Sequence, residues 1–336
     1  MGTPRRTATL ALAAAATLGS AGSAYIGVRN LLVGQADQAR RVIPQSWDIP
    51  PRADGVYAPG GGPVERWNRD VPFDLHLMIF GDSTATGYGA TTADEVPGVL
   101  LARGLAEISG RRIRLSTKAI VGATSKGLSG QIDAMFVAGP PPDAAVIMIG
   151  ANDITRPNGI RPSAHRLGDG VRRLRAAGAV VVVGTCPDFG VITAIPQPLR
   201  AVARSRGLRL ARAQAAAVRA AGAIPVPLAD LLAPHFRTTP EALFSPDMFH
   251  PSGAGYALAA NQLLPALCNA LSEWIGTAAP ELPWQSRSGE GSALLARVSG
   301  LSRLWRRSTG VPAPVLGGVP GLGQGRVPAP VAASAS

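Results

Sequence analysis

The sequence contains little cysteine, few aromatic residues and almost no lysine. There are 2 cysteines in 336 residues, aromatic residues make up 5%, and only two of the 33 basic residues are lysines. Two cysteines are too few for a disulfide framework or a zinc site. Two interpretations therefore stay open for Cys186 and Cys268: two small buried side chains, or a disulfide that forms if the domain is exported.

The net charge of +12 is concentrated at the two ends of the chain. Residues 1–70 carry 8 basic and 5 acidic residues, residues 71–285 carry 19 and 15, and residues 286–336 carry 6 and 1. A nucleic-acid site needs a basic patch on the fold with aromatic partners. The net charge of residues 71–285 is only +4, from 19 basic minus 15 acidic residues, and aromatic residues are few. We therefore expect no nucleic-acid partner. Basic ends favour attraction to an acidic membrane or cell-envelope surface.

An uncharged segment stands close to the N-terminus. Arg5-Arg6 precedes it, it runs over residues 7–28, and Arg29 follows. As a helix it would span roughly 33 Å, enough for a bilayer core of about 30 Å. Small residues at 19–24 could serve as a signal-peptidase site. We expect residues 1–29 to be a cleaved signal peptide or a retained membrane anchor, and both predict an exported domain.

The rest of the chain divides into three parts by composition. Residues 30–73 begin with a short helical pattern and become rich in Pro and Gly, which predicts a linker or extended arm that Trp47 and Trp67 hold against the domain. Residues 74–285 form one folded domain. Residues 286–336 are rich in Pro, Gly, Ala and basic residues, and are predicted to be a disordered tail.

Residues 75–275 alternate between apolar runs and segments with helical spacing, a pattern typical of an α/β fold. Parallel strands joined by helical crossovers form a sheet that is covered on both faces. The sequence therefore predicts a flavodoxin-like three-layer α/β/α sandwich with a five-stranded parallel sheet in spatial order 2-1-3-4-5. Strands are expected at 75–80, 112–116, 144–149, 179–184 and 223–228, and helices at 96–109, 127–137, 163–177, 197–220 and 253–275.

Ser83 is the candidate nucleophile. It follows the first predicted strand in the sequence Gly81-Asp82-Ser83, where an α/β enzyme presents a reactive hydroxyl. A serine hydroxyl needs a base to accept its proton. Of the four histidines only His250 has an acid three positions before it, Asp247, and that spacing lets the carboxylate orient the imidazole.

Two further residues are candidates for stabilising an oxyanion. Asn152 directly follows the third predicted strand, and its side-chain amide can donate a hydrogen bond there. Gly122 follows the second strand and lets a backbone N–H approach a substrate closely. The backbone N–H of Ser83 would be the third donor. The loop after Ser83 lacks the lysine of a phosphate-binding loop, so that alternative is disfavoured.

These stretches together resemble the blocks of the SGNH, or GDSL, hydrolase superfamily. Gly81-Asp82-Ser83 resembles the first block, Gly122 the second, Gly150-Ala151-Asn152-Asp153 the third, and Asp247-Met248-Phe249-His250 the last. The N-terminal segment and the Pro-rich arm look like those of exported actinobacterial members. The resemblance implies the SGNH hydrolase fold and hydrolysis of esters or thioesters by a serine nucleophile, without a metal or cofactor.

We therefore expect an exported serine esterase that acts on small esters through Ser83, His250 and Asp247. No long insertion interrupts residues 75–275 to form a lid, which favours short acyl chains. Three alternatives stay open: an acetyl-esterase acting on a cell-envelope glycan or lipid, an acyltransferase acting there, and a non-catalytic envelope-binding module. The expected partners are a small ester substrate and the membrane or cell envelope.

Overall fold

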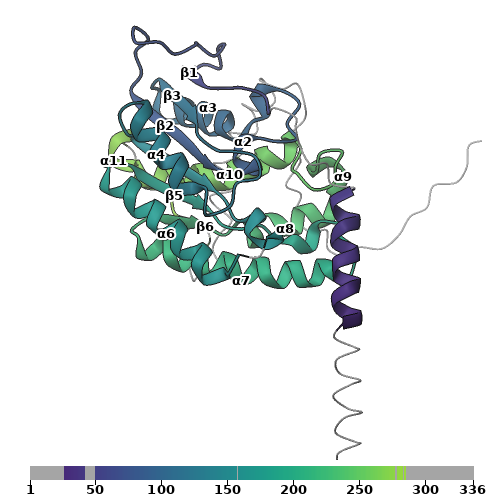
Figure 1. Cartoon of the computed structure of the whole chain (residues 1–336). Helices are drawn as coiled ribbons and strands as arrows, with labels where there is room; N and C mark the ends of the chain where they lie inside the picture. Colours follow the sequence, from purple (N-terminus) through teal and green to yellow (C-terminus); the bar gives the residue numbers. More distant parts are fainter. Residues whose placement is uncertain (1–25, 42–49, 157, 277, 283, 285–336) are drawn as a thin grey trace, which may run out of the picture.

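A computed structural model describes residues 26–41, 50–156, 158–276, 278–282 and 284. Most of the predicted export segment at 1–29 lies outside the described residues. Trp47 and the whole of the predicted tail at 286–336 also lie outside them. In the described part, no helix combines the length and the apolar character needed to cross a bilayer. Residues 26–41 form a helix that projects from the body of the protein in Figure 1.

The centre of the fold is a six-stranded sheet in the order β1-β3-β2-β4-β5-β6. The strands are β1 (Gly55–Tyr57), β2 (Leu75–Gly81), β3 (Ile113–Thr117), β4 (Ala144–Met148), β5 (Val180–Gly184) and β6 (Ile224–Val226). Strands β2 to β6 are parallel to one another, and β1 pairs with β3 in the antiparallel direction. The parallel part has the predicted order 2-1-3-4-5, which confirms the α/β fold class.

The sheet has one strand more than predicted, because part of the Pro/Gly-rich arm joins its edge. Residues 55–57 pair with residues 113–115, and Val56 also exchanges two backbone hydrogen bonds with Glu65. Trp67 holds the arm as predicted, since the guanidinium of Arg114 lies 3.4 Å from its ring centroid. A strand of only three residues has no hydrophobic periodicity for sequence analysis to detect.

Helices cover both faces of the sheet (Figure 1). The helices are α2 (Ser83–Thr86), α3 (Pro97–Ser109), α4 (Leu128–Ala138), α5 (Ala151–Thr155), α6 (Ile160–Ala176), α7 (Leu199–Ala220), α8 (Leu228–Thr238), α9 (Pro240–Leu243), α10 (Gly253–Ala270) and α11 (Ser272–Ile275), with 3-10 turns η1 (Ala93–Glu95) and η2 (Phe189–Val191). In β4, Ala144 and Val146 belong to the core beneath α3 and α10, while Ala145 and Ile147 belong to the core beneath α4 and α6. The predicted closing helix at 253–275 is two helices, interrupted at Leu271.

The carboxyl ends of three central strands lie side by side. Gly81 of β2 and Gly184 of β5 both pair with Met148 of β4. The loops that follow these strands therefore meet at one edge of the sheet, where open α/β folds bind their ligands. The disulfide interpretation is wrong, since Cys186 and Cys268 are both buried and unpaired. Burial raises the pKa of the Cys268 thiol to about 12.

Candidate active site

Ser83 begins helix α2 directly after strand β2. Its side chain is 6% exposed, and the preceding Asp82 caps the helix by accepting a hydrogen bond from the N–H of Thr84, at 3.1 Å. The backbone carbonyl of Ser83 accepts the hydroxyl of Thr86, at 2.8 Å. Within the described part of the chain the N–H of Ser83 donates to no acceptor. The turn therefore fixes the serine and leaves this N–H available.

His250 joins Ser83 to Asp247, as the sequence predicts. The Nε2 atom of His250 lies 3.1 Å from the Oγ of Ser83, and its Nδ1 lies 2.6 Å from Oδ2 of Asp247. An ionised carboxylate can only accept, so Nδ1 carries a proton and donates it to Asp247. That tautomer leaves Nε2 as an acceptor for the serine proton. All three side chains are at least nine-tenths buried.

The turn that carries Asp247 is held by hydrogen bonds to its carboxylate. Oδ1 accepts the backbone N–H groups of Phe249 at 2.9 Å and His250 at 2.8 Å, and the hydroxyl of Ser245 at 2.8 Å. Met248 has a φ of +52°, a left-handed conformation that non-glycine residues rarely adopt. Burial alone would raise the pKa of Asp247, but the hydrogen bonds outweigh it and hold the pKa at about 2. The carboxylate is thus ionised at neutral pH.

Two aromatic rings pack against the imidazole of His250. The ring of Tyr88 lies with its centroid 4.4 Å away, and that of Phe249 lies 4.9 Å away. The hydroxyl of Tyr256 donates to the backbone carbonyl of Tyr88, at 2.5 Å, and fixes the segment. Sequence analysis missed Tyr88, because no local pattern indicates a contact between residues so far apart in the chain.

The structure brings the two predicted oxyanion residues next to each other. The Nδ2 of Asn152 donates to the carbonyl of Ala123, at 3.0 Å, directly after Gly122. Gly122 has a φ of +77°, and its N–H has no acceptor among the residues described. Among the described residues, neither Asn152 nor Gly122 is hydrogen-bonded to Ser83. Gly122 lies on the loop after β3, and Asn152 lies on the short helix α5 after β4, beside the turn that leads into Ser83.

Two buried carboxylates that sequence analysis did not assign hold these loops together. The Oδ2 of Asp82 accepts the N–H of Gly150, at 3.2 Å. Burial raises the pKa of Asp82 to about 6. Asp153, 2% exposed, accepts three side-chain donors and one backbone N–H, from Ser125 Oγ and N, Ser163 Oγ and Asn158 Nδ2. The motif positions Asp82 and Asp153 are visible in the sequence, but their burial is not.

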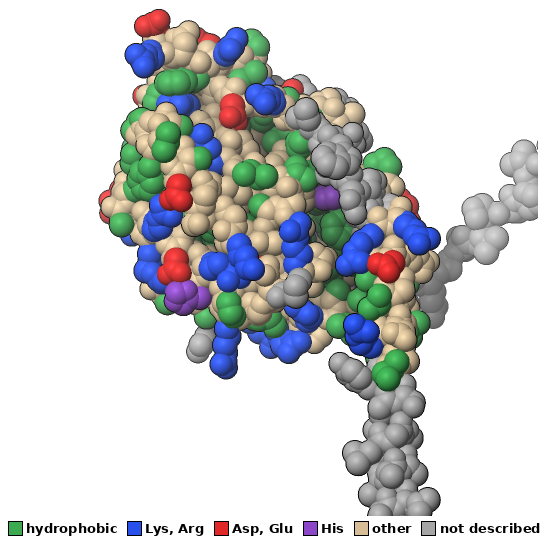
Figure 2. All heavy atoms as spheres, viewed as in Figure 1, with side chains coloured by type: hydrophobic (Ala, Val, Ile, Leu, Met, Phe, Trp, Pro, Cys, Tyr) green, Lys and Arg blue, Asp and Glu red, His purple; other side chains and the backbone are tan. Residues whose placement is uncertain are grey.

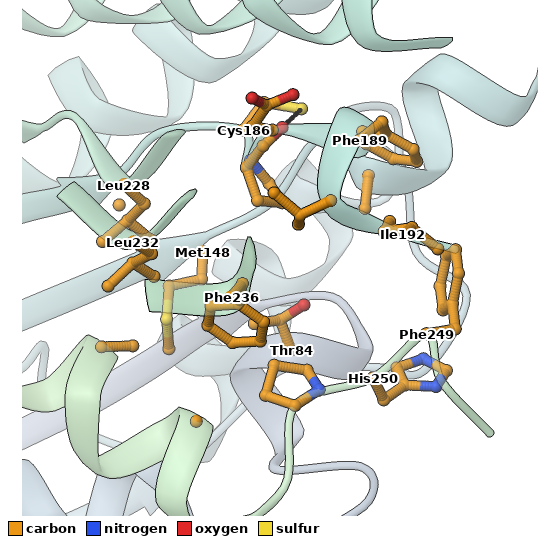
Figure 3. Close-up of a pocket in the computed structure, with 18 of the residues that line it drawn as sticks. Thr84, Met148, Cys186, Phe189, Ile192, Leu228, Leu232, Phe236, Phe249 and His250 are labelled. Carbon is orange, nitrogen blue, oxygen red and sulfur yellow. Dashed lines mark hydrogen bonds between the residues drawn. The ribbon is translucent and has the colours of Figure 1, made fainter. Parts of the chain in front are cut away.

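An apolar cavity opens beside Ser83 and His250. Its volume is about 80 Å³. In Figure 3 Phe189 and Ile192 lie on one side, Leu228 and Leu232 on the other, and His250 at its edge. Figure 2 shows hydrophobic side chains and a histidine in a hollow on this face. The walls come from the loop after β5 and from α8, so neither is adjacent to Ser83 in the sequence.

Another buried histidine lies apart from this cluster. His76, inside β2, is buried and within 2.9 Å of the hydroxyl of Ser116. Among the described residues no three His, Cys, Asp or Glu side chains are grouped so as to hold a metal ion. The cluster is therefore a serine, a histidine and a carboxylate in hydrogen-bonded series next to an apolar cavity, the arrangement that acyl transfer requires.

The comparisons with known proteins point to one family. Residues 79–258 match the model of the GDSL-like lipase/acylhydrolase family. The chain is also 68% identical over 307 residues to a GDSL-like esterase of Mycobacterium tuberculosis, an alignment that covers 90% of this chain and 96% of that esterase. This similarity extends well beyond the four motif blocks.

Solved structures with a related arrangement include two enzymes of low sequence identity. A lipase/acylhydrolase from Enterococcus faecalis is 20% identical, with a TM-score of 0.47, covering 62% of this chain and 100% of that one. The esterase EstA from Pseudoalteromonas sp. is 19% identical, with a TM-score of 0.45, covering 61% and 100%.

Proposed function

This chain belongs to the GDSL-like lipase/acylhydrolase family and is a carboxylic ester hydrolase, and we propose that it cleaves short-chain esters outside the cytoplasm. We propose Ser83 as the nucleophile. The observation that carries the proposal is the hydrogen-bonded series Ser83–His250–Asp247, with distances of 3.1 Å and 2.6 Å. The series has the geometry of an activated serine.

In the proposed reaction His250 acts first as base and then as acid. Its Nε2 accepts the proton of Ser83 while Oγ attacks the ester carbonyl carbon, and a tetrahedral oxyanion forms. The imidazolium, stabilised by Asp247, then protonates the leaving alcohol, and an acyl-enzyme remains. Water repeats the two steps and releases the carboxylic acid, which regenerates the free serine.

Three donors are available for the oxyanion. The backbone N–H groups of Ser83 and Gly122 have no acceptor in the described part of the protein. Asn152 uses one amide hydrogen for the carbonyl of Ala123, and its second hydrogen can point at the substrate. A donor whose orientation is already fixed costs no reorganisation when the negative charge develops.

The cavity supports a short acyl chain. A volume of about 80 Å³ holds roughly five to eight water-sized groups, since each needs about 10–15 Å³ in this measure. A methylene group is of similar size, so we expect the rate to rise from acetyl esters up to acyl chains of at most about five to eight carbons, and to fall for longer chains. The apolar side chains that line the cavity favour alkyl groups over sugar hydroxyls.

Export rests on the sequence of residues 1–29. An uncharged stretch between basic residues is typical of a signal peptide or membrane anchor. Fractionation of cells that produce the full chain tests this part of the proposal. We expect the enzyme in the envelope or the medium, and recovery from the cytoplasm of cells with intact export would contradict it.

The activity proposal is tested with p-nitrophenyl esters of increasing acyl length. Ser83→Ala should abolish hydrolysis of all of them. Ile192→Ala enlarges the cavity and should shift the preferred chain to a longer one, while Ile108→Ala, at an exposed position on α3, should not. Undiminished hydrolysis by Ser83→Ala, or an unchanged preference in Ile192→Ala, would contradict the assignment of the nucleophile or of the acyl cavity, respectively.

A further inference from the structure

A second pocket, lined by arginines, lies on the surface beside the acyl cavity. It has a volume of about 360 Å³. The turn η2 separates the two spaces, since Phe189 and Val191 line the acyl cavity and Gly190 between them lines the second pocket. Figure 2 shows basic side chains gathered on this face, over α7 and α8. The lining residues are Gly190, Gln197, Arg200, Ala201, Arg204 and Arg237.

One buried carboxylate holds two of the three arginines. Asp188 is 3% exposed at its side chain and accepts the Nε of Arg204 with both oxygens, each at 3.1 Å, and the Nη2 of Arg237 at 2.7 Å. Each of these arginines is still 49% exposed. A single guanidinium would neutralise Asp188, so the second leaves an uncompensated positive charge.

Arg200 adds a further charge. Its guanidinium has no hydrogen-bond or ion-pair partner among the described residues. Arg200, Arg204 and Arg237 line the pocket, and no acidic residue is among the described residues that line it. Against the single charge of Asp188 they leave a local excess of two positive charges.

The loop is shaped to bring the arginines together. A Cβ on Gly190 would lie 2.3 Å from Cδ of Arg204 and 2.9 Å from Oδ1 of Asp188, so a side chain at this position would displace Arg204 from its place against Asp188. The N–H of Gly190 donates to Asp188 at 2.7 Å and completes the turn. Arg204 is thus held against the loop backbone with half of its side chain open to the pocket.

We propose that this pocket binds a phosphate-type anion. Guanidinium groups present paired N–H donors that match the oxygens of a phosphate, and two of the three are already fixed in position. The anion can come from the headgroup of an acidic phospholipid or from a phosphate group on a soluble ligand. The site does not depend on the role proposed for Ser83.

The N-terminal helix lies at the edge of the same pocket. Gln35, on the helix at 26–41, donates to the carbonyl of Gln197 and accepts the N–H of Leu199, the latter at 3.0 Å. Gln197 lines the pocket. The chain that follows the predicted export segment therefore meets the domain beside the arginines, which would place them near a membrane if that segment is retained.

The first test measures binding of inorganic phosphate to the full chain. The midpoint of thermal unfolding is followed against phosphate concentration, with chloride at equal ionic strength as reference, because a ligand of the folded state raises the midpoint. We expect Arg200→Gln to raise the dissociation constant for phosphate by about tenfold or more, because the variant loses one charge-assisted hydrogen bond to the anion. Arg212→Gln, on the same helix but outside the pocket, and Ser83→Ala should bind like the original chain.

The proposal is overturned if phosphate gives no specific shift, or the same shift in Arg200→Gln as in Arg212→Gln. The second test identifies the source of the anion with vesicles of phosphatidylcholine, with or without phosphatidylglycerol. Extra binding to phosphatidylglycerol that Arg200→Gln loses and Arg212→Gln keeps supports a lipid headgroup. Phosphate binding without this lipid dependence supports a soluble phosphorylated ligand at the same site.

Discussion

The carboxylate of Asp82 ties the start of the helix that carries Ser83 to the start of the helix that carries Asn152. It accepts the N–H of Thr84 with one oxygen and the N–H of Gly150 with the other, at 3.1 Å and 3.2 Å. The two helices, α2 and α5, follow neighbouring parallel strands, β2 and β4. A single buried side chain therefore sets the position of the nucleophile relative to a proposed oxyanion donor.

Replacing Asp82 by Asn should disturb that position while keeping the size of the side chain. The new amide NH₂ cannot accept the N–H that faces it, so one of the two links is lost. We expect kcat for a p-nitrophenyl ester to fall by about ten- to a hundredfold, because small displacements at a reacting centre are costly. The control is Asp70→Asn, at an exposed position in the arm. Equal kcat in the two variants would show that Asp82 does not position the site.

Asp247→Asn should lower kcat far more than it changes KM. The amide can still accept hydrogen bonds, but it no longer stabilises the imidazolium or holds the tautomer with the Nδ1 proton. Losses of about 10⁴ are typical when this carboxylate is neutralised. Steady-state kinetics with a short-chain ester measure the effect. A fall of less than tenfold would mean that Asp247 does not orient His250 during the reaction.

Asn152→Ala tests the oxyanion donor. Removal of one such donor typically costs about 10²–10³ in kcat, with little effect on ground-state binding. Asn68→Ala, at an exposed position of the arm, provides the matched control. If kcat stays the same and KM rises instead, Asn152 contributes to substrate binding rather than to stabilisation of the transition state.

His76 predicts a pH dependence of stability that is independent of the active site. Burial, followed by the charges of Arg114 and Lys118, lowers the pKa of His76 from 6.5 to about 4. Between these values the unfolded chain binds a proton that the folded chain does not, so stability falls as the pH drops from 6.5 to 4. The contribution is fully present above pH 6.5 and is at most about 3 kcal/mol.

Urea unfolding at several pH values between 7.5 and 4 measures this contribution. His76→Gln removes the titrating group and should unfold with a smaller loss of stability on acidification than the original chain. His165→Gln provides the control, since the side chain of His165 is 73% exposed. Parallel pH profiles for His76→Gln and the original chain would contradict the prediction.

Local sequence patterns predicted the parts of the protein that depend on short-range order. The valine run at 180–183 and the helical spacing at 96–109 predicted a strand and a helix close to their observed bounds, 180–184 and 97–109. The acid three residues before His250 placed Asp247 correctly, because the contact is made within a single turn. The partnership of Ser83 and His250, 167 positions apart, was predicted from their chemistry, because a serine nucleophile needs a base and only His250 among the histidines has an acid three positions before it. The resemblance to a known family then supported the pairing.

The contacts that build the acyl cavity and the arginine-lined pocket could not be predicted from the sequence. The acyl cavity combines η2, α8 and the turn after α9, and no periodicity links them. The arginines around Asp188 come from separate helices, α7 and α8, and in the sequence Arg200 and Arg204 look like ordinary exposed residues of an Arg-rich helix. Strand β1 was missed for a related reason, because its three residues are fixed by their partner strand and not by a pattern of their own.

In the proposed reaction Ser83 forms the acyl-enzyme, and the position of a covalent adduct on the protein tests this role. The full chain is treated with a fluorophosphonate, which reacts with activated serines, and the modified peptide is identified by mass spectrometry. We predict one adduct, on Ser83, that Ser83→Ala lacks and that forms more slowly in Asp247→Asn. An active enzyme that carries the adduct on another residue, with Ser83 unmodified, would contradict the account.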